Sequence, residues 1–107
     1  MTTAFNELEK AHENKFQHDL ELQFKAKARR NHLVGLWAAE LLGLKNGEAH
    51  KYAEELVGLH IKDTGWQQIH HRILSDFSHR GVQKSAHQIE RTIHELMAEA
   101  DYQIRNE

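Results

Sequence analysis

The sequence predicts an all-α protein: a four-helix bundle with a long N-terminal helix whose first part is a mobile or partner-binding arm. None of the 107 residues is proline, the residue that most strongly interrupts helices. Apolar residues recur three or four positions apart along four segments, and strand-like alternation of β-branched and polar residues is almost absent. Short connections between the segments favour packing within one bundle.

The first helix is expected to begin between residues 4 and 18, to run through Leu42 and to change character near residue 32. Its first part carries one narrow row on one helix face, formed by Phe5, Leu8, His12, Phe16, Leu20 and Phe24. Core helices usually carry a wider apolar stripe, so this row, called the seam below, indicates a helix that binds a partner. From residue 32 the stretch HLVGLWAAELLGL is typical of a core helix, and Gly43 is expected to terminate it. We therefore divide the chain into an arm, residues 1–19, and an anchoring domain, residues 20–107.

The second helix is expected at about 48–62, with Asn46 as its N-cap. Its apolar residues share one face, which predicts packing on a single side. Gly35 and Gly58 lie inside the first and second helical patterns, where glycine costs about 1 kcal/mol relative to alanine. Close approach of a neighbouring helix would compensate for that cost at both positions.

The third and fourth helices each follow a Ser/Thr-x-x-Gln sequence that matches a capping box. Thr64 and Gln67 predict the start of the third helix, and Gly81 its end. Ser85 and Gln88 predict the start of the fourth helix, which has the most regular apolar spacing in the chain.

Composition excludes several functional classes. The net charge of −2 argues against a nucleic-acid-binding protein, and the absence of cysteine excludes disulfides. The sequence has neither a signal-peptide pattern nor an apolar run long enough to insert in a membrane. We expect a cytoplasmic protein with no direct membrane insertion.

Ten histidines raise the question of a metal site, but they are spread from residue 12 to residue 94. Glu9 and His12 give a single Glu-x-x-His pair, whereas di-iron bundles need two such pairs and two further glutamates. The set of His87, Glu90 and His94 lies on one helix face without a complete zinc motif. We expect no metal site, and surface histidines are the preferred interpretation.

The run KAKARRNH, residues 25–32, is the most basic part of the chain. Lys25, Arg29 and Arg30 are candidates for contact with phosphates or with an acidic protein surface, although a solvated helix face is the preferred interpretation. Glycine-rich phosphate loops are absent, and no nucleophile and base can be paired from the sequence. We expect a protein that is not an enzyme.

The seam has enough apolar surface to contribute to binding. Each large apolar side chain that becomes buried contributes about 1.5–3 kcal/mol. Ordering a segment costs about 2–5 kcal/mol, and association costs a further 4–15 kcal/mol or so. The seam alone would therefore bind weakly or moderately, and contacts from the folded domain would strengthen binding. Whether the arm is ordered or disordered in the free protein stays open.

Two stretches resemble a known family, and the resemblance spans nearly the whole chain. The first runs from Phe5 to Gly43 and is most specific in FKAKARRNHLVGLWAAELLG at residues 24–43, where Lys25, Arg29, Arg30, Asn31 and Trp37 occur in the family's order. The second comprises GVQKSAHQIER and ELMAEA, within residues 81–100. Both are similar to the zeta subunit of the alphaproteobacterial F-type ATP synthase, the inhibitor subunit of that enzyme.

The resemblance implies a four-helix protein whose N-terminal helix inserts into the catalytic head of ATP synthase and blocks rotation in the direction of ATP hydrolysis. The partners would be the alpha, beta and gamma subunits, and the protein would lie peripheral to the inner membrane through the synthase. No cofactor is implied, although family members resemble weak nucleotide binders. An alternative from another class is a small helical domain that binds a nucleotide or a metal ion and does not inhibit ATP synthase.

Overall fold

The computed structural model describes the backbone of residues 2–107 and the side chains of residues 15–107. It has four helices: α1 (Thr2–Leu41), α2 (Gly47–Lys62), α3 (Gln67–Arg80) and α4 (Ala86–Arg105). No strand occurs in the described backbone. The predicted all-α fold with a long N-terminal helix is therefore confirmed.

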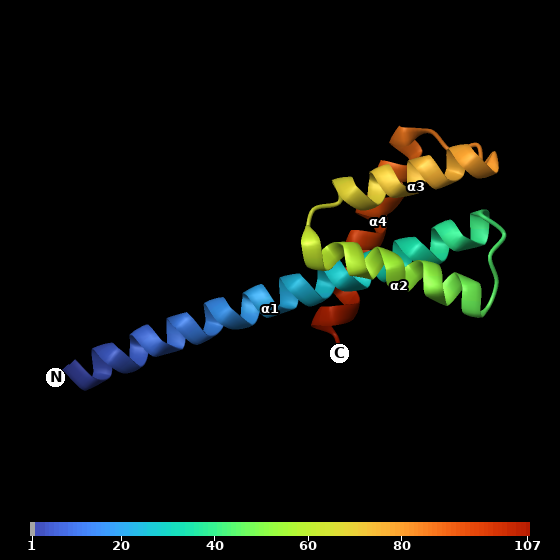
Figure 1. The fold of residues 1–107 in the computed structure, drawn as a ribbon. Helices are drawn as coiled ribbons and strands as arrows, with labels where there is room; N and C mark the ends of the chain where they lie inside the picture. The colour runs from blue at the N-terminus through green and yellow to red at the C-terminus, as the bar shows by residue number, and fades with distance from the viewer. Residues whose placement is uncertain (1) are drawn as a thin grey trace.

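Helix α1 gives the molecule its elongated shape, with a longest dimension of 68 Å (Figure 1). Its N-terminal half projects away from the other helices, while its C-terminal half packs against both α2 and α4 (Figure 1). Helix α3 packs on α4 and on α2 at the end of the molecule remote from the N-terminus (Figure 1). One long helix therefore serves both as a projecting arm and as a central element of the domain.

The packed part of α1 begins earlier than residue 32, the position that the apolar pattern predicted. Ala26, Arg30 and Asn31 are already buried. Sequence pattern missed them because one is small and two are polar, and the polar pair is buried only because other helices supply hydrogen-bond partners. The domain thus contacts α1 at least one turn further toward the N-terminus than expected.

A close crossing of α1 and α2 depends on Gly35. A Cβ atom built at this position would lie 2.6 Å from the Cα atom of Ala53, so only glycine fits without movement of the backbone. Gly35 thus has the role predicted for it. Gly58 does not, because a Cβ atom there would meet nothing within 4 Å.

The helix termini agree in part with those predicted from the sequence. Gly43 and Gly81 adopt positive φ angles of 79° and 71° just after α1 and α3, as expected of terminating glycines. Ser85 and Gln88 form the complete capping box predicted for α4. Asn46 occupies the N-cap position of α2, but its side chain makes no capping hydrogen bond.

The capping box predicted at Thr64 is wrong. Helix α3 begins at Gln67 with Trp66 as its N-cap residue, and no side chain caps it. The preceding residues form a turn, in which the carboxylate of Asp63 accepts a hydrogen bond of 2.9 Å from the backbone N–H of Gly65. The backbone carbonyl of Thr64 accepts a hydrogen bond from Arg30, so this turn also fastens α1.

The core lies between the C-terminal half of α1 and the three other helices. It is formed by Val34, Ala38, Ala39, Tyr52, Leu56, Ile69, Ile73, Phe77, Ile89 and Ile93. Trp37 packs on this core with its ring 5.7 Å from that of Phe77, as expected of a core residue. None of the described helices is apolar over a stretch long enough to cross a membrane.

Candidate partner-binding surface

The described part of the seam is exposed on the projecting half of α1. The side chains of Phe16, Leu20 and Phe24 are 64%, 45% and 51% exposed. Their spacing of four residues places them along one face of the helix. Three large apolar side chains in a row are thus open to solvent, and of these Phe24 is partly covered by the domain. The side chains of Phe5, Leu8 and His12, the other seam residues, lie outside the described part of the chain.

Phe24 joins the seam to the folded domain. Its ring centroid lies 4.4 Å from that of His60, near the end of α2. His60 is 1% exposed, and neither of its ring nitrogens has a hydrogen-bond partner among the described residues. Burial and the nearby positive charges of Arg30 and Lys27 lower the pKa of His60, and the backbone of Phe24 opposes them, so the folded state favours the neutral ring.

Arg30 belongs to the interior of the domain, unlike the other basic candidates. Its side chain is 4% exposed, and its guanidinium donates hydrogen bonds to the Asn31 side chain (3.0 Å) and to the Thr64 carbonyl (3.2 Å). Asn31 in turn donates a bond of 3.0 Å to the carbonyl of Leu56. Arg30 therefore ties α1 to α2 and to the loop before α3, and it is not presented to a partner in this conformation.

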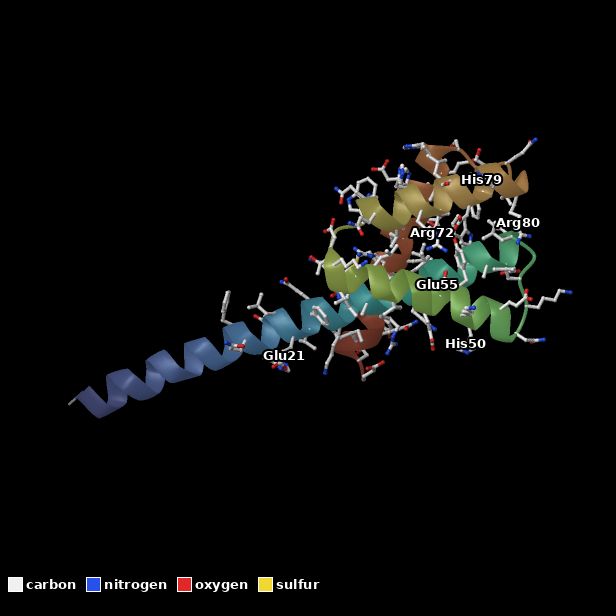
Figure 2. The ribbon with its side chains drawn as sticks, viewed as in Figure 1. Glu21, His50, Glu55, Arg72, His79 and Arg80 are labelled. Carbon is white, nitrogen blue, oxygen red and sulfur yellow. The ribbon has the colours of Figure 1, made fainter. Side chains whose placement is uncertain are left out.

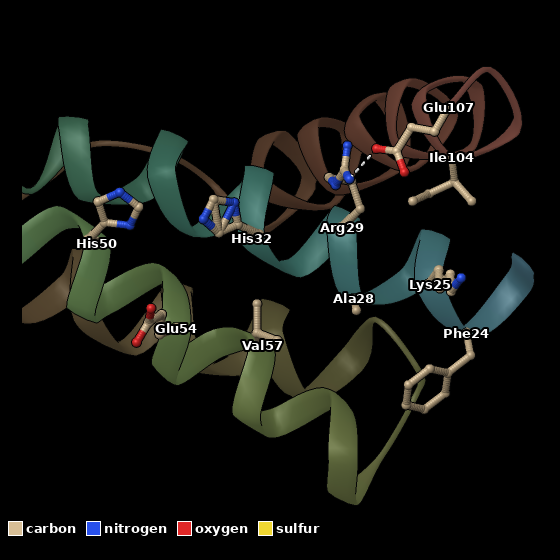
Figure 3. A pocket seen from close by; sticks show the side chains of 10 residues that line it. All are labelled: Phe24, Lys25, Ala28, Arg29, His32, His50, Glu54, Val57, Ile104 and Glu107. Atoms are coloured by element: carbon tan, nitrogen blue, oxygen red, sulfur yellow. Dashed lines mark hydrogen bonds and ion pairs between the residues drawn. The ribbon is translucent and has the colours of Figure 1, made fainter. Parts of the chain in front are cut away.

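Lys25 and Arg29 lie together on another face of α1, in a groove that also includes His32 (Figure 3). Lys25 is exposed, and Arg29 is partly exposed. The structure therefore divides the basic run into two groups. One group faces solvent within a groove, and Arg30 faces the protein interior.

A polar network that sequence reasoning did not identify links α2 and α3. The hydroxyl of Tyr52 donates a 2.7 Å hydrogen bond to Asp76, and Arg72 donates to Asp76 (2.8 Å) and to Glu55 (2.9 Å). The labelled side chains of Arg72 and Glu55 lie between these helices in Figure 2. Burial and the carboxylate of Asp76 raise the pKa of Tyr52, so its hydroxyl remains a donor. The network has a structural role, because its hydrogen bonds connect α2 and α3.

Metal-ligand geometry is absent from the part of the chain whose side chains are described. No three histidine, cysteine or acidic side chains converge there as a ligand set. The Nε2 atom of His94 lies 3.6 Å from the carboxylate of Glu90, and the Nδ1 atom of His79 lies 2.7 Å from the backbone carbonyl oxygen of Ser75. The pair of Glu9 and His12 lies outside the described side chains.

Comparison with protein families shows the family to which the chain belongs. The family model of the ATPase inhibitor subunit zeta matches residues 1–103. The chain belongs to the zeta family of ATPase inhibitor subunits. Family membership supports a regulatory, non-catalytic role as an inhibitor of ATP synthase. No curated protein matches the sequence.

The zeta-like stretch at residues 24–43 has mainly a structural role in this chain. Asn31, Val34 and Ala38 are fully buried within it, and Trp37 packs on the core. Much of this stretch is therefore the part of α1 that packs within the domain. The residues of this stretch that remain exposed or partly exposed, among them Phe24, Lys25 and Arg29, are the ones open to a partner, together with the rest of the described seam.

Proposed function

We propose that this zeta-family chain inhibits ATP hydrolysis by inserting the N-terminal part of α1 into the catalytic head of F-type ATP synthase, against the alpha, beta and gamma subunits. The seam forms the contact surface, and the packed part of residues 20–107 anchors the helix outside the head. Bound in this way, the chain lies on the cytoplasmic side, peripheral to the inner membrane.

The exposed seam supports this proposal most directly. Phe16, Leu20 and Phe24 are each about half exposed or more, on a helix that extends well beyond the packed domain (Figure 1). Exposed apolar side chains in a contiguous row are typical of protein-binding surfaces. An amphipathic helix that lies in a groove of its partner uses residues at this spacing as anchors.

The arm must also resist rotation, and its junction with the domain is suited to that role. Arg30 and Asn31 bond to α2 and the following loop within two turns of Phe24, and Gly35 lets the two helix backbones approach closely. Force on the arm is therefore transmitted to a rigid domain, because these groups tie α1 to other elements. The domain remains outside the head as an anchor.

The test compares binding to the synthase with binding of small ligands. The full chain, immobilised through its C-terminus, is incubated with the purified catalytic head of an alphaproteobacterial ATP synthase, and ATP hydrolysis is measured in parallel. We expect the head to be retained and hydrolysis to fall as the chain is added. Failure to retain the head, together with tight binding of ATP or Zn²⁺ by the isolated chain in calorimetry, would refute the proposal and support the ligand-binding alternative.

A further inference from the structure

A groove opens beside the root of the arm, where α1, α2 and the end of α4 meet (Figure 3). It has a volume of about 670 Å³. Lys25, Arg29 and His32 line it from α1, and His50 and Glu54 line it from α2. Glu107 closes the third side (Figure 3). The groove thus gathers four groups that are or can become cationic, from segments far apart in the sequence.

An ion pair within the protein shows that this groove can bind a carboxylate. The guanidinium of Arg29 donates one hydrogen bond to the Gln103 side chain (2.7 Å) and another to the carboxylate of Glu107. The side chains of Arg29 and Glu107 are 32% and 54% exposed. Exposed ion pairs of this kind contribute about 0–1 kcal/mol, so a carboxylate from another molecule can replace Glu107 at little cost.

The groove also has an apolar part that continues the seam. Ala28, Val57 and Ile104 line it beside the cations, and Phe24 belongs both to the seam and to the groove wall (Figure 3). A partner that covers the seam therefore reaches the groove without a break in the contact surface.

We propose that the groove is a second docking site, which binds an acidic segment of the ATP synthase head beside the inserted arm. The segment places a carboxylate on Arg29 and Lys25 in exchange for Glu107, and its apolar residues cover Val57 and Ile104. This inference rests on the proposed function, since it names a further part of the same interface. Contact at the domain also supplies the additional affinity that a thin seam requires.

His32, which faces His50 across the groove, makes this site sensitive to pH. The ring centroids of His32 and His50 lie 6.0 Å apart across the groove. Around His32 the charged and titratable groups are His50 and Glu54 on α2 and Arg29 on α1, with Lys25 and Glu107 elsewhere on the groove wall. Burial, His50 and Arg29 lower the pKa of His32, whereas Glu54 opposes them. A bound carboxylate favours the protonated ring of His32, and carboxylates stay ionised well below pH 6, since their ordinary pKa is about 4. Binding therefore tightens as the pH falls from 7.5 to 6.

The experiment measures the dissociation constant of the full chain for the purified head. The double variant Lys25→Glu, Arg29→Glu is expected to bind at least tenfold more weakly than the unaltered chain. The matched control Lys45→Glu, Lys84→Glu makes the same change in net charge at exposed positions outside the groove and is expected to bind normally. Circular dichroism establishes that each variant is folded.

A variant that is expected to bind the head more tightly separates a loss of contact from structural damage. Glu107→Gln removes the competing carboxylate, so it is expected to tighten binding severalfold, although it deletes an internal ion pair. The double variant His32→Gln, His50→Gln is expected to abolish the gain in affinity between pH 7.5 and pH 6. Weaker binding by Glu107→Gln, or an unchanged pH profile in the histidine variant, would contradict the proposed site.

The outcomes also separate this inference from the proposed function. If the unaltered chain does not bind the head, the proposed function fails. If it binds and the Lys25, Arg29 variant binds equally well, only the groove proposal fails. NMR shifts of His32 and His50 on addition of millimolar ATP, combined with unchanged head binding by that variant, would assign the groove to a nucleotide and overturn the proposal.

Discussion

The ring of Phe24 packs on the ring of His60, with centroids 4.4 Å apart and an interplanar angle of 50°. Phe24 is the last residue of the seam, and His60 lies near the end of α2 with both ring nitrogens unpaired among the described residues. The arm therefore leaves the domain over an uncharged, buried histidine. Because burial favours the neutral ring of His60, the stability of the folded chain depends on pH.

The first prediction concerns that dependence. The pKa of His60 is lowered in the folded state by burial and then by Arg30, whereas in the unfolded chain it is about 6.5. The unfolded state thus binds the proton more readily, so the stabilising effect of neutral His60 is present above pH 6.5 and is lost as the pH falls below it. The partly buried His32, whose pKa is also lowered, adds to the same trend. Urea unfolding between pH 5 and pH 7.5 is expected to show stability rising with pH.

Replacement of the buried histidine isolates its contribution. His60→Leu removes two unpaired polar atoms, each of which costs about 1–3 kcal/mol when buried, so at pH 5.5 the variant is expected to be more stable than the unaltered chain. Its stability should also vary less with pH. The exposed His18 provides the control, and His18→Leu should leave the unfolding profile unchanged. Equal pH dependence in the His60 variant and the unaltered chain would refute this explanation.

The second prediction tests the seam with single substitutions. Leu20→Ala removes an exposed apolar side chain, so it should leave the stability of the free chain unchanged while weakening inhibition of ATP hydrolysis about tenfold or more, the effect of losing about 1.5 kcal/mol of burial in the complex. Glu21 lies about 100° around the helix from Leu20, and Glu21→Ala should inhibit normally. Equal inhibition by the two variants would show that the seam is not the contact face.

The third prediction contrasts two glycines inside helices. Gly35→Ala forces a Cβ atom to within 2.6 Å of the Ala53 backbone, so it should destabilise the fold by about 1–3 kcal/mol. Gly58→Ala meets open space and should stabilise it by about 0.5–1 kcal/mol, because alanine favours the helix. Chemical denaturation of both variants measures the two effects. Loss of stability in the Gly58 variant would contradict the helix geometry described for α2.

The fourth prediction concerns the two capping sequences. Ser85→Ala should cost about 1 kcal/mol of stability, because the Ser85 hydroxyl accepts a hydrogen bond from the backbone of Gln88. Thr64→Ala should have little effect, because only the backbone carbonyl of Thr64 takes part in a hydrogen bond to Arg30. Thermal unfolding distinguishes the two. A large loss of stability in the Thr64 variant would indicate that the Thr64 side chain caps α3, contrary to the structure.

Local features of the fold were predictable from the sequence, whereas features that depend on distant segments were not. The spacing of apolar residues identified all four helices, and the Ser85 capping box was correct because its partners are three residues apart. The burial of Arg30 and Asn31 was missed, since their partners lie on α2 and in the next loop. Thr64 matched the same local pattern as Ser85, but the turn formed by Asp63 delays the start of α3.

The same distinction applies to the candidate site: features within one helix were predictable, and features formed between helices were not. The seam was visible as a periodic row, because its members share one helix. The groove was not visible, since Arg29 meets Glu107 across 78 positions of the chain and His32 meets His50 across two helices. Only the crossing of α1, α2 and α4 brings these groups together.

Removal of the arm tests the central claim most directly. A chain lacking residues 2–19 is added to the purified catalytic head, and the rate of ATP hydrolysis is compared with that in the presence of the full chain. Circular dichroism and cooperative thermal unfolding first establish that the shortened chain retains the folded domain. We expect inhibition to be abolished in the folded, shortened chain. Undiminished inhibition by that chain would contradict the claim that the arm is the inhibitory element.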